Sequence, residues 1–136
     1  MAEGDSGVHK KLILLVEDDA FLRDIFSRKM RDSSFDLISV DNGEEAIRAA
    51  RERKPDVILL DLNLPDANGF EVLKTIRSDE SLKQTLVLIL TNSVLSEDVI
   101  RSNELKADDF LTKANFSMEE IIERIESHMA KRATVH

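Results

Sequence analysis

The residues with the clearest chemical potential in this chain are polar side chains that come directly after apolar runs. Glu17 and Asp18 follow one run and Asp61 follows a second, while Thr91 and Lys113 follow two more. Clustered carboxylates without histidine or cysteine favour a hard cation, and a few carboxylates with water fit Mg²⁺ better than Ca²⁺. A cation, a lysine and a hydroxyl group can stabilise a transferring phosphoryl group. The pattern therefore indicates Mg²⁺-dependent phosphoryl transfer, with the carboxylate of Asp61 as nucleophile.

These side chains meet only if the apolar runs are neighbouring strands. Five short runs predict strands, at residues 12–16, 35–40, 57–60, 86–90 and 110–112. Their near-continuous apolar character is typical of parallel strands that are buried on both faces. The segments between them repeat apolar residues at three- and four-residue steps, as amphipathic helices do. The alternation predicts one doubly wound α/β domain of five strands and five helices, with ligands bound beyond the carboxyl ends of the strands.

Capping signals support this division into elements. Asn42 and Glu45 have the spacing of a capping box, as do Ser117 and Glu120, and Asp19 is the expected cap of the first helix. We expect the folded domain to span residues 10–130. Flexible segments are expected at residues 1–9 and 131–136, because chain ends with few apolar residues are rarely tied down.

Composition excludes several other classes of protein. The 136 residues include no cysteine, which excludes a disulfide framework and a thiolate metal site. The net charge of −8 argues against direct binding to nucleic acid, because phosphate contacts need clustered lysine and arginine. No apolar run is long enough to span a membrane or to form a signal peptide. We therefore expect a cytoplasmic protein that binds neither nucleic acid nor membrane.

Several motifs carry a resemblance to a known family. The segments LVEDD (15–19), LDLNLP (60–65), LT (90–91) and FLTK (110–113), together with Gly69, resemble the receiver domain of two-component response regulators. The motifs occur in the family's order over nearly the whole chain. The resemblance implies a flavodoxin-like sheet of strand order 2-1-3-4-5. It also implies that a histidine kinase or a phosphotransfer protein donates the phosphoryl group.

The resemblance assigns a metal role to four positions. It implies that Glu17, Asp18 and Asp61 hold Mg²⁺ through their carboxylates, with Asp18 the most direct ligand. Asn63 would add a backbone carbonyl oxygen. The metal would neutralise charge on the phosphoryl group during its transfer.

The resemblance also assigns the switch and the partners. Lys113 would pair with the phosphoryl oxygens, while Thr91 moves toward the phosphoryl group and Phe110 turns inward behind it. The kinase is expected to dock against the first helix. Because no output domain follows residue 130 in this sequence, we expect the signal to pass to a downstream protein target. The oligomeric state stays open.

Two departures from the family pattern leave alternatives open. Ala114 stands where the family usually has a proline after a cis bond, and Asn92 stands where it has a small residue. The bond before Ala114 is either trans, with a different loop, or cis at a cost of about 2.5–4 kcal/mol. One alternative function is a receiver-like interaction module that is never phosphorylated. A phosphohydrolase is less expected, because Asn63 stands where such an enzyme has an acidic proton donor.

Overall fold

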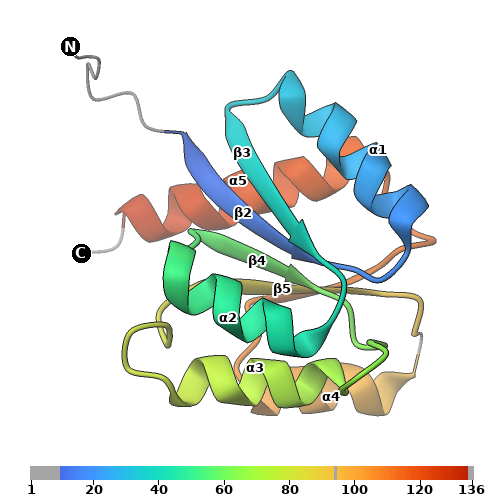
Figure 1. Cartoon of the computed structure of the whole chain (residues 1–136), viewed down its shortest axis with the longest axis vertical. Coiled ribbons are helices and arrows are strands. Elements are labelled where there is room, and N and C mark those ends of the chain that lie inside the picture. Colours follow the sequence, from blue (N-terminus) through green and yellow to red (C-terminus); the bar gives the residue numbers. More distant parts are fainter. Residues whose placement is uncertain (1–9, 94, 135–136) are drawn as a thin grey trace.

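The computed structural model describes residues 10–93 and 95–134, and its strands form a single parallel sheet (Figure 1). The strands are β2 (Lys11–Val16), β3 (Phe35–Val40), β4 (Val57–Leu60), β5 (Leu86–Thr91) and β6 (Asp109–Thr112). Their order is β3-β2-β4-β5-β6, which is the predicted order 2-1-3-4-5 when strands are counted along the chain. Val16 lies opposite Val40 and Leu60, so the carboxyl ends of these strands meet at one edge.

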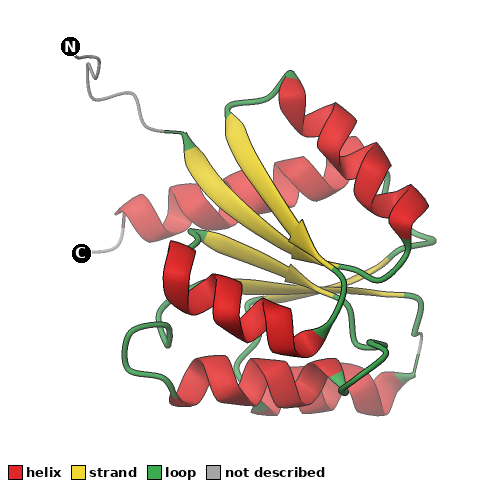
Figure 2. Ribbon diagram, viewed as in Figure 1, coloured by secondary structure: helices red, strands yellow, loops and turns green. Residues whose placement is uncertain are grey.

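Helices cover both faces of the sheet (Figure 2). They are α1 (Ala20–Arg31), α2 (Gly43–Arg53), α3 (Gly69–Ser78), α4 (Ser96–Glu104) and α5 (Met118–Thr134). One buried cluster joins the sheet to α1 and α5, and the other joins it to α2 and α3. Successive residues of β4 alternate between these two clusters and are all fully buried. The prediction that the strands are buried on both faces is therefore confirmed for β4, β5 and most of β2. The edge strands β3 and β6 are only partly buried.

The helix caps agree with the capping signals in the sequence. Asp19 accepts hydrogen bonds from two backbone N–H groups in the first turn of α1. Ser117 and Glu120 exchange two hydrogen bonds, at 3.1 and 2.8 Å, before α5. Asn42 accepts from the backbone N–H of Glu45 at 2.9 Å and so caps α2. These short-range contacts fix where each helix starts.

The carboxyl end of the chain differs from the expectation. The boundary placed at residue 130 falls inside α5, which continues to Thr134. The reason is a long-range contact, because Arg132 donates a hydrogen bond to the carbonyl oxygen of Gln84 and lies 3.8 Å from a carboxylate oxygen of Asp108. Segment 1–9 and residues 135–136, which we expected to be flexible, lie outside the described residues.

Two further expectations concern the backbone and the membrane. No cis peptide bond occurs among the described residues, so the bond between Lys113 and Ala114 is trans. This resolves the choice that the departure from proline left open. Within the described ranges, none of the helices has both the length and the apolar character needed to cross a membrane.

Candidate functional site

The site lies at the edge of the sheet where the strands end. Glu17, Asp61 and Lys113 are the first residues after β2, β4 and β6, and each backbone N–H still donates to the neighbouring strand, at 3.0, 3.1 and 2.7 Å. The sheet ladder thus extends by one residue at each position. This fixes the backbone from which the three functional side chains project.

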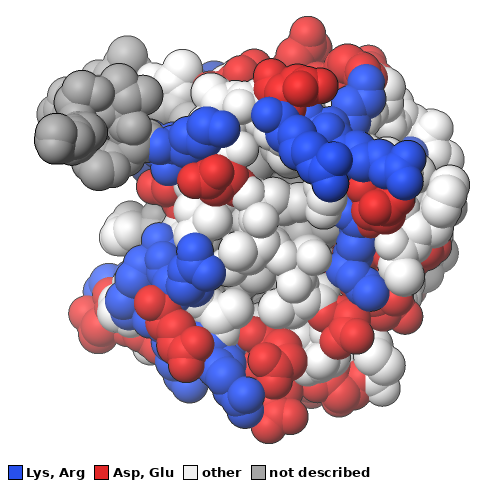
Figure 3. Space-filling view, turned by 45° about the horizontal axis from the view of Figure 1, so that its top comes forward, with Lys and Arg blue, Asp and Glu red and all other residues white. Residues whose placement is uncertain are grey.

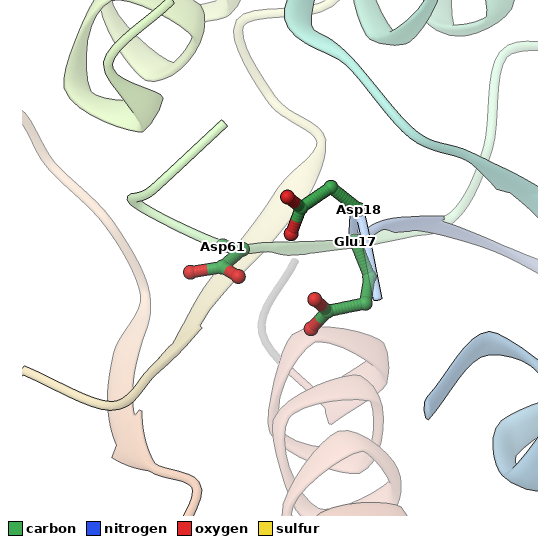
Figure 4. A group of neighbouring side chains, drawn as sticks. All are labelled: Glu17, Asp18 and Asp61. Atoms are coloured by element: carbon green, nitrogen blue, oxygen red, sulfur yellow. The ribbon is translucent and has the colours of Figure 1, made fainter. Parts of the chain in front are cut away.

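Three carboxylates gather at this edge (Figure 4). Glu17, Asp18 and Asp61 each place one carboxylate oxygen within 4.8 Å of the others. Glu17 and Asp61 are buried, whereas Asp18 is exposed to solvent. Two like charges about 4 Å apart near a protein surface repel by roughly 4 kcal/mol. The cluster therefore needs positive charge to offset it.

Lys113 supplies part of that charge. Its Nζ lies 2.6 Å from Oε1 of Glu17 and 3.0 Å from Oδ2 of Asp61. Burial disfavours the ammonium form, but the close contacts with the two carboxylates outweigh it and raise the pKa of Lys113. Burial also raises the pKa of the Glu17 carboxyl, and Asp61 adds to this rise while Lys113 opposes it. Three carboxylates facing one ammonium leave an excess of negative charge.

The donor set fits a divalent cation. Oε1 of Glu17 is buried and receives no hydrogen bond of normal geometry from the described residues, although the ammonium of Lys113 is close. Carboxylate oxygens are the ligands that Mg²⁺ prefers, and Mg²⁺ commonly uses a few carboxylates and keeps several waters. The exposed position of Asp18 leaves one side of the cluster open to such waters.

The remaining predicted site residues are Asn63, Thr91 and Phe110, and their contacts differ. The backbone N–H of Asn63 donates to Oδ1 of Asp61 at 3.1 Å, so the loop after β4 folds back on the carboxylate. Thr91 is fully buried at the end of β5, and its Oγ1 accepts from the backbone N–H of Ser93 at 3.2 Å. Phe110 is half-buried on β6 and packs against the buried cluster beneath α2 and α3.

Two residues support the site through contacts that the sequence did not reveal. Arg23 of α1 donates from Nη1 to the carbonyl oxygen of Glu17 at 2.8 Å. A Cβ atom on Gly69 would lie 2.4 Å from the carbonyl oxygen of Asp61, so only glycine allows α3 to start this close to the loop. Gly69 entered the sequence analysis only as one of the motifs of the family resemblance, and Arg23 is one of several charged residues on α1.

Millimolar Mg²⁺ is expected to raise the melting temperature of the protein by several degrees. A ligand that binds only the folded state stabilises it by about 2.7 kcal/mol at one hundred times its dissociation constant. The measurement is a thermal melt in EDTA and in MgCl₂. Asp18→Asn should reduce the rise, whereas the matched variant Asp36→Asn, at an exposed position on β3, should keep it. An equal rise in both variants would contradict a metal site at this cluster.

Comparison with known proteins agrees with this geometry. The family model described as the response regulator receiver domain matches residues 13–126. The cell cycle response regulator CtrA of Brucella ovis is 39% identical over 124 residues, which are 91% of this chain and 52% of that protein. The chain thus spans about half the length of the curated relatives it matches.

Two solved structures of response regulators share the architecture. The phosphorylated cyanobacterial phytochrome response regulator RcpA is 28% identical, with a TM-score of 0.78 over 94% of this chain and 97% of that one. The Mn²⁺-bound form of response regulator Rcp1 is 36% identical, with a TM-score of 0.74 over 86% of this chain and 92% of that one.

Proposed function

The chain belongs to the response regulator receiver family of two-component signalling, and on that premise we propose that Asp61 accepts a phosphoryl group from a histidine kinase or a phosphotransfer protein. The observation that carries the proposal is the contact of Lys113 with Asp61 beside two further carboxylates. The phosphorylated form of RcpA and the Mn²⁺-bound form of Rcp1 support it by analogy.

The residues of this chain would divide the chemistry among them. A carboxylate oxygen of Asp61 attacks the phosphorus, the bond to the donor imidazole breaks, and the imidazole nitrogen keeps the electron pair. Lys113 already contacts Oδ2 of Asp61, so its ammonium is close enough to stabilise negative charge on the oxygens of a phosphoryl group bound there. The backbone N–H of Asn63 holds Oδ1 and orients the carboxylate. Mg²⁺, when bound by Glu17, Asp18 and Asp61, would neutralise phosphoryl oxygens, and the backbone carbonyl of Asn63 would complete its protein ligands.

The switch is part of the same proposal. We assign it to Thr91 and Phe110, which lie on the neighbouring strands β5 and β6. The hydroxyl of Thr91 would turn from the N–H of Ser93 toward the phosphoryl group. Phosphorylation would then shift a two-state equilibrium of α4 and β6, and a downstream protein would read that face. Such a protein signals in the cytoplasm and at most catalyses its own phosphorylation and dephosphorylation.

The two departures from the family pattern bear on the rival function, an unphosphorylated interaction module. The bond before Ala114 is trans, yet Lys113 still reaches Glu17 and Asp61. The absence of proline therefore does not displace the lysine. Asn92 is exposed beside Thr91 and remains the departure that favours the rival, because it can narrow access to Asp61.

Intact mass after incubation with acetyl phosphate tests the proposal. With Mg²⁺ we expect one added phosphate, and with EDTA we expect almost none. Asp61→Asn should abolish the adduct, because the amide is not a nucleophile. The matched control Asp36→Asn should label like the natural chain. No adduct, under conditions where a known receiver is labelled, would overturn the proposal in favour of the interaction module.

A further inference from the structure

A cationic cavity lies at the opposite edge of the sheet, where β5 and β6 begin. We call it the basal cavity; its volume is about 550 Å³, which is typical of small-molecule pockets. Five cationic side chains from α3, α5 and the loops before β5 and β6 line it: Lys74, Arg77, Lys83, Lys106 and Arg132. Only two carboxylates, those of Glu104 and Asp108, accompany them. The lining therefore carries a formal charge of +3 in a chain whose net charge is −8.

An ion pair between Arg77 and Asp108 lies in the lining of the basal cavity. Nη2 of Arg77 lies 2.9 Å from Oδ2 of Asp108, and that oxygen also accepts from the backbone N–H of Val87 at 2.9 Å. The same guanidinium donates to the carbonyl oxygens of Thr85 and Lys106, at 2.7 and 2.9 Å. Arg77 thus ties the two loops together and neutralises Asp108. Lys83 pairs with Glu80 at 3.0 Å, and Arg132 contacts the carbonyl oxygen of Gln84 and a carboxylate oxygen of Asp108.

Lys74 and Lys106 are the lining cations whose ammonium groups have no partner among the described residues. Within residues 10–93 and 95–134, neither ammonium group makes a hydrogen bond or an ion pair. Lys106 also has a backbone φ of 67°, a left-handed conformation that favours glycine. A lysine is therefore less favourable than glycine at this position, and its ammonium forms no contact that would compensate within the described chain.

A neighbouring cavity contains a second lysine with left-handed backbone, Lys54, whose Nζ donates to Oγ of Ser81 at 2.9 Å. Its volume is about 500 Å³, it shares Gln84 and Arg132 with the basal cavity, and Lys54 lines it. Lys54 has a φ of 47°, so both described non-glycine residues with left-handed backbone are lysines that line these adjoining cavities. Figure 3 shows that lysine and arginine side chains form several groups on one face of the molecule, interleaved with acidic side chains.

We propose that the basal cavity binds a small anion that carries two or more phosphate groups. Ammonium and guanidinium groups bind phosphate oxygens through charge-assisted hydrogen bonds. No aromatic side chain lines the cavity and Leu105 is its one large apolar residue, so recognition rests on the phosphates and not on a stacked base. The bound anion would lie near the carboxyl ends of α3 and α4, at the edge away from Asp61. Because helix carboxyl ends carry partial negative charge, the lysine and arginine side chains must supply all of the attraction.

The test uses inorganic tripolyphosphate as the probe and isothermal titration calorimetry as the measurement. EDTA is present throughout, so that no metal ion links the probe to the acidic cluster. The combined variant Lys74→Gln with Lys106→Gly removes both unpaired ammonium groups, and glycine suits the left-handed backbone, so the variant should fold. The control Arg28→Gln removes one positive charge from α1, where Arg28 is exposed and pairs with Asp24.

We expect binding to the natural chain that weakens with added salt. We expect a loss of about tenfold in affinity for each ammonium removed and less than a twofold loss for Arg28→Gln. Amide NMR shifts on titration should centre on Lys83 and Asp108 and leave Asn63 unchanged. Absence of heat at low salt, an equal loss in the control, or shifts centred on Asn63 would each overturn the proposal.

Discussion

Replacing Lys113 with methionine is expected to lower the free energy of unfolding by about 3–5 kcal/mol in metal-free buffer. Methionine keeps most of the length of the side chain but removes the ammonium that lies 2.6 Å from Glu17 and 3.0 Å from Asp61. Both carboxylates are buried, so their charges would be left without compensation. Urea unfolding at pH 8 in EDTA measures the effect.

The size of this loss should depend on pH, on metal and on Glu17. Burial already raises the pKa of the Glu17 carboxyl, and loss of the ammonium would raise it further. A raised carboxyl pKa destabilises the fold above that pKa, so the deficit should shrink as the pH falls and Glu17 takes up a proton. Mg²⁺ should also reduce the deficit. The added substitution Glu17→Gln should restore part of the stability, and an unchanged deficit in that double variant would contradict the account.

The matched control is Lys29→Met. Lys29 also contacts one carboxylate, that of Glu119, but both side chains are at least half exposed. Water screens such a pair, so its removal should leave the unfolding curve nearly unchanged. The contrast between the two lysines isolates the effect of burial from the effect of charge alone.

Replacing Gly69 with alanine is expected to destabilise the fold by about 1–3 kcal/mol. This is the opposite of what helix propensity alone predicts. Alanine normally favours a helix over glycine by roughly 1 kcal/mol. Here the new Cβ would lie 2.4 Å from the carbonyl oxygen of Asp61 and 2.7 Å from Cα of Leu62, and both neighbours are backbone atoms that cannot rotate away. The loop that carries Asp61 must therefore move.

Two measurements check this prediction. Urea unfolding gives the loss of stability, and the rate of labelling by acetyl phosphate should fall because Asp61 no longer sits in its original position. The control is Gly43→Ala at the start of α2, where the nearest atoms belong to the side chains of Ala67 and Val72 at 3.1 Å. The methyl group of Val72 can shift with its side chain, and both contacts are longer than the 2.4 Å contact at Gly69, so this variant should lose less. A Gly69→Ala protein as stable as the natural chain would contradict the prediction.

The sequence predicted the elements well because each signal acts over a few residues. Apolar runs identified the strands, and Asp19 and Ser117 marked helix starts through contacts with backbone no more than three residues away. Since parallel strands end at one edge, the polar residues after β2, β4 and β6 could be expected to meet. The structure brings the acidic cluster and Lys113 together as that reasoning required.

The features that the sequence did not predict all depend on long-range contacts. Asp66 accepts from the backbone N–H groups of Gly43 and Glu44, at 2.7 and 3.0 Å, and so provides α2 with a second cap from a distant loop. Arg132 extends α5 through contact with Gln84, 48 residues away. Neither pairing leaves a local pattern, because the tertiary fold alone sets which segments become neighbours.

The position of Lys113 has a consequence for how any cation enters the acidic cluster. The ammonium already contacts Glu17 and Asp61, so an incoming ion would have to exchange with an internal competitor. The net binding free energy of the ion would then be the difference between its own interaction with these oxygens and that of the ammonium. Binding would therefore be weaker than to three carboxylates without a lysine. Such a site would load and unload readily, and the fold would keep its charge balance during each exchange.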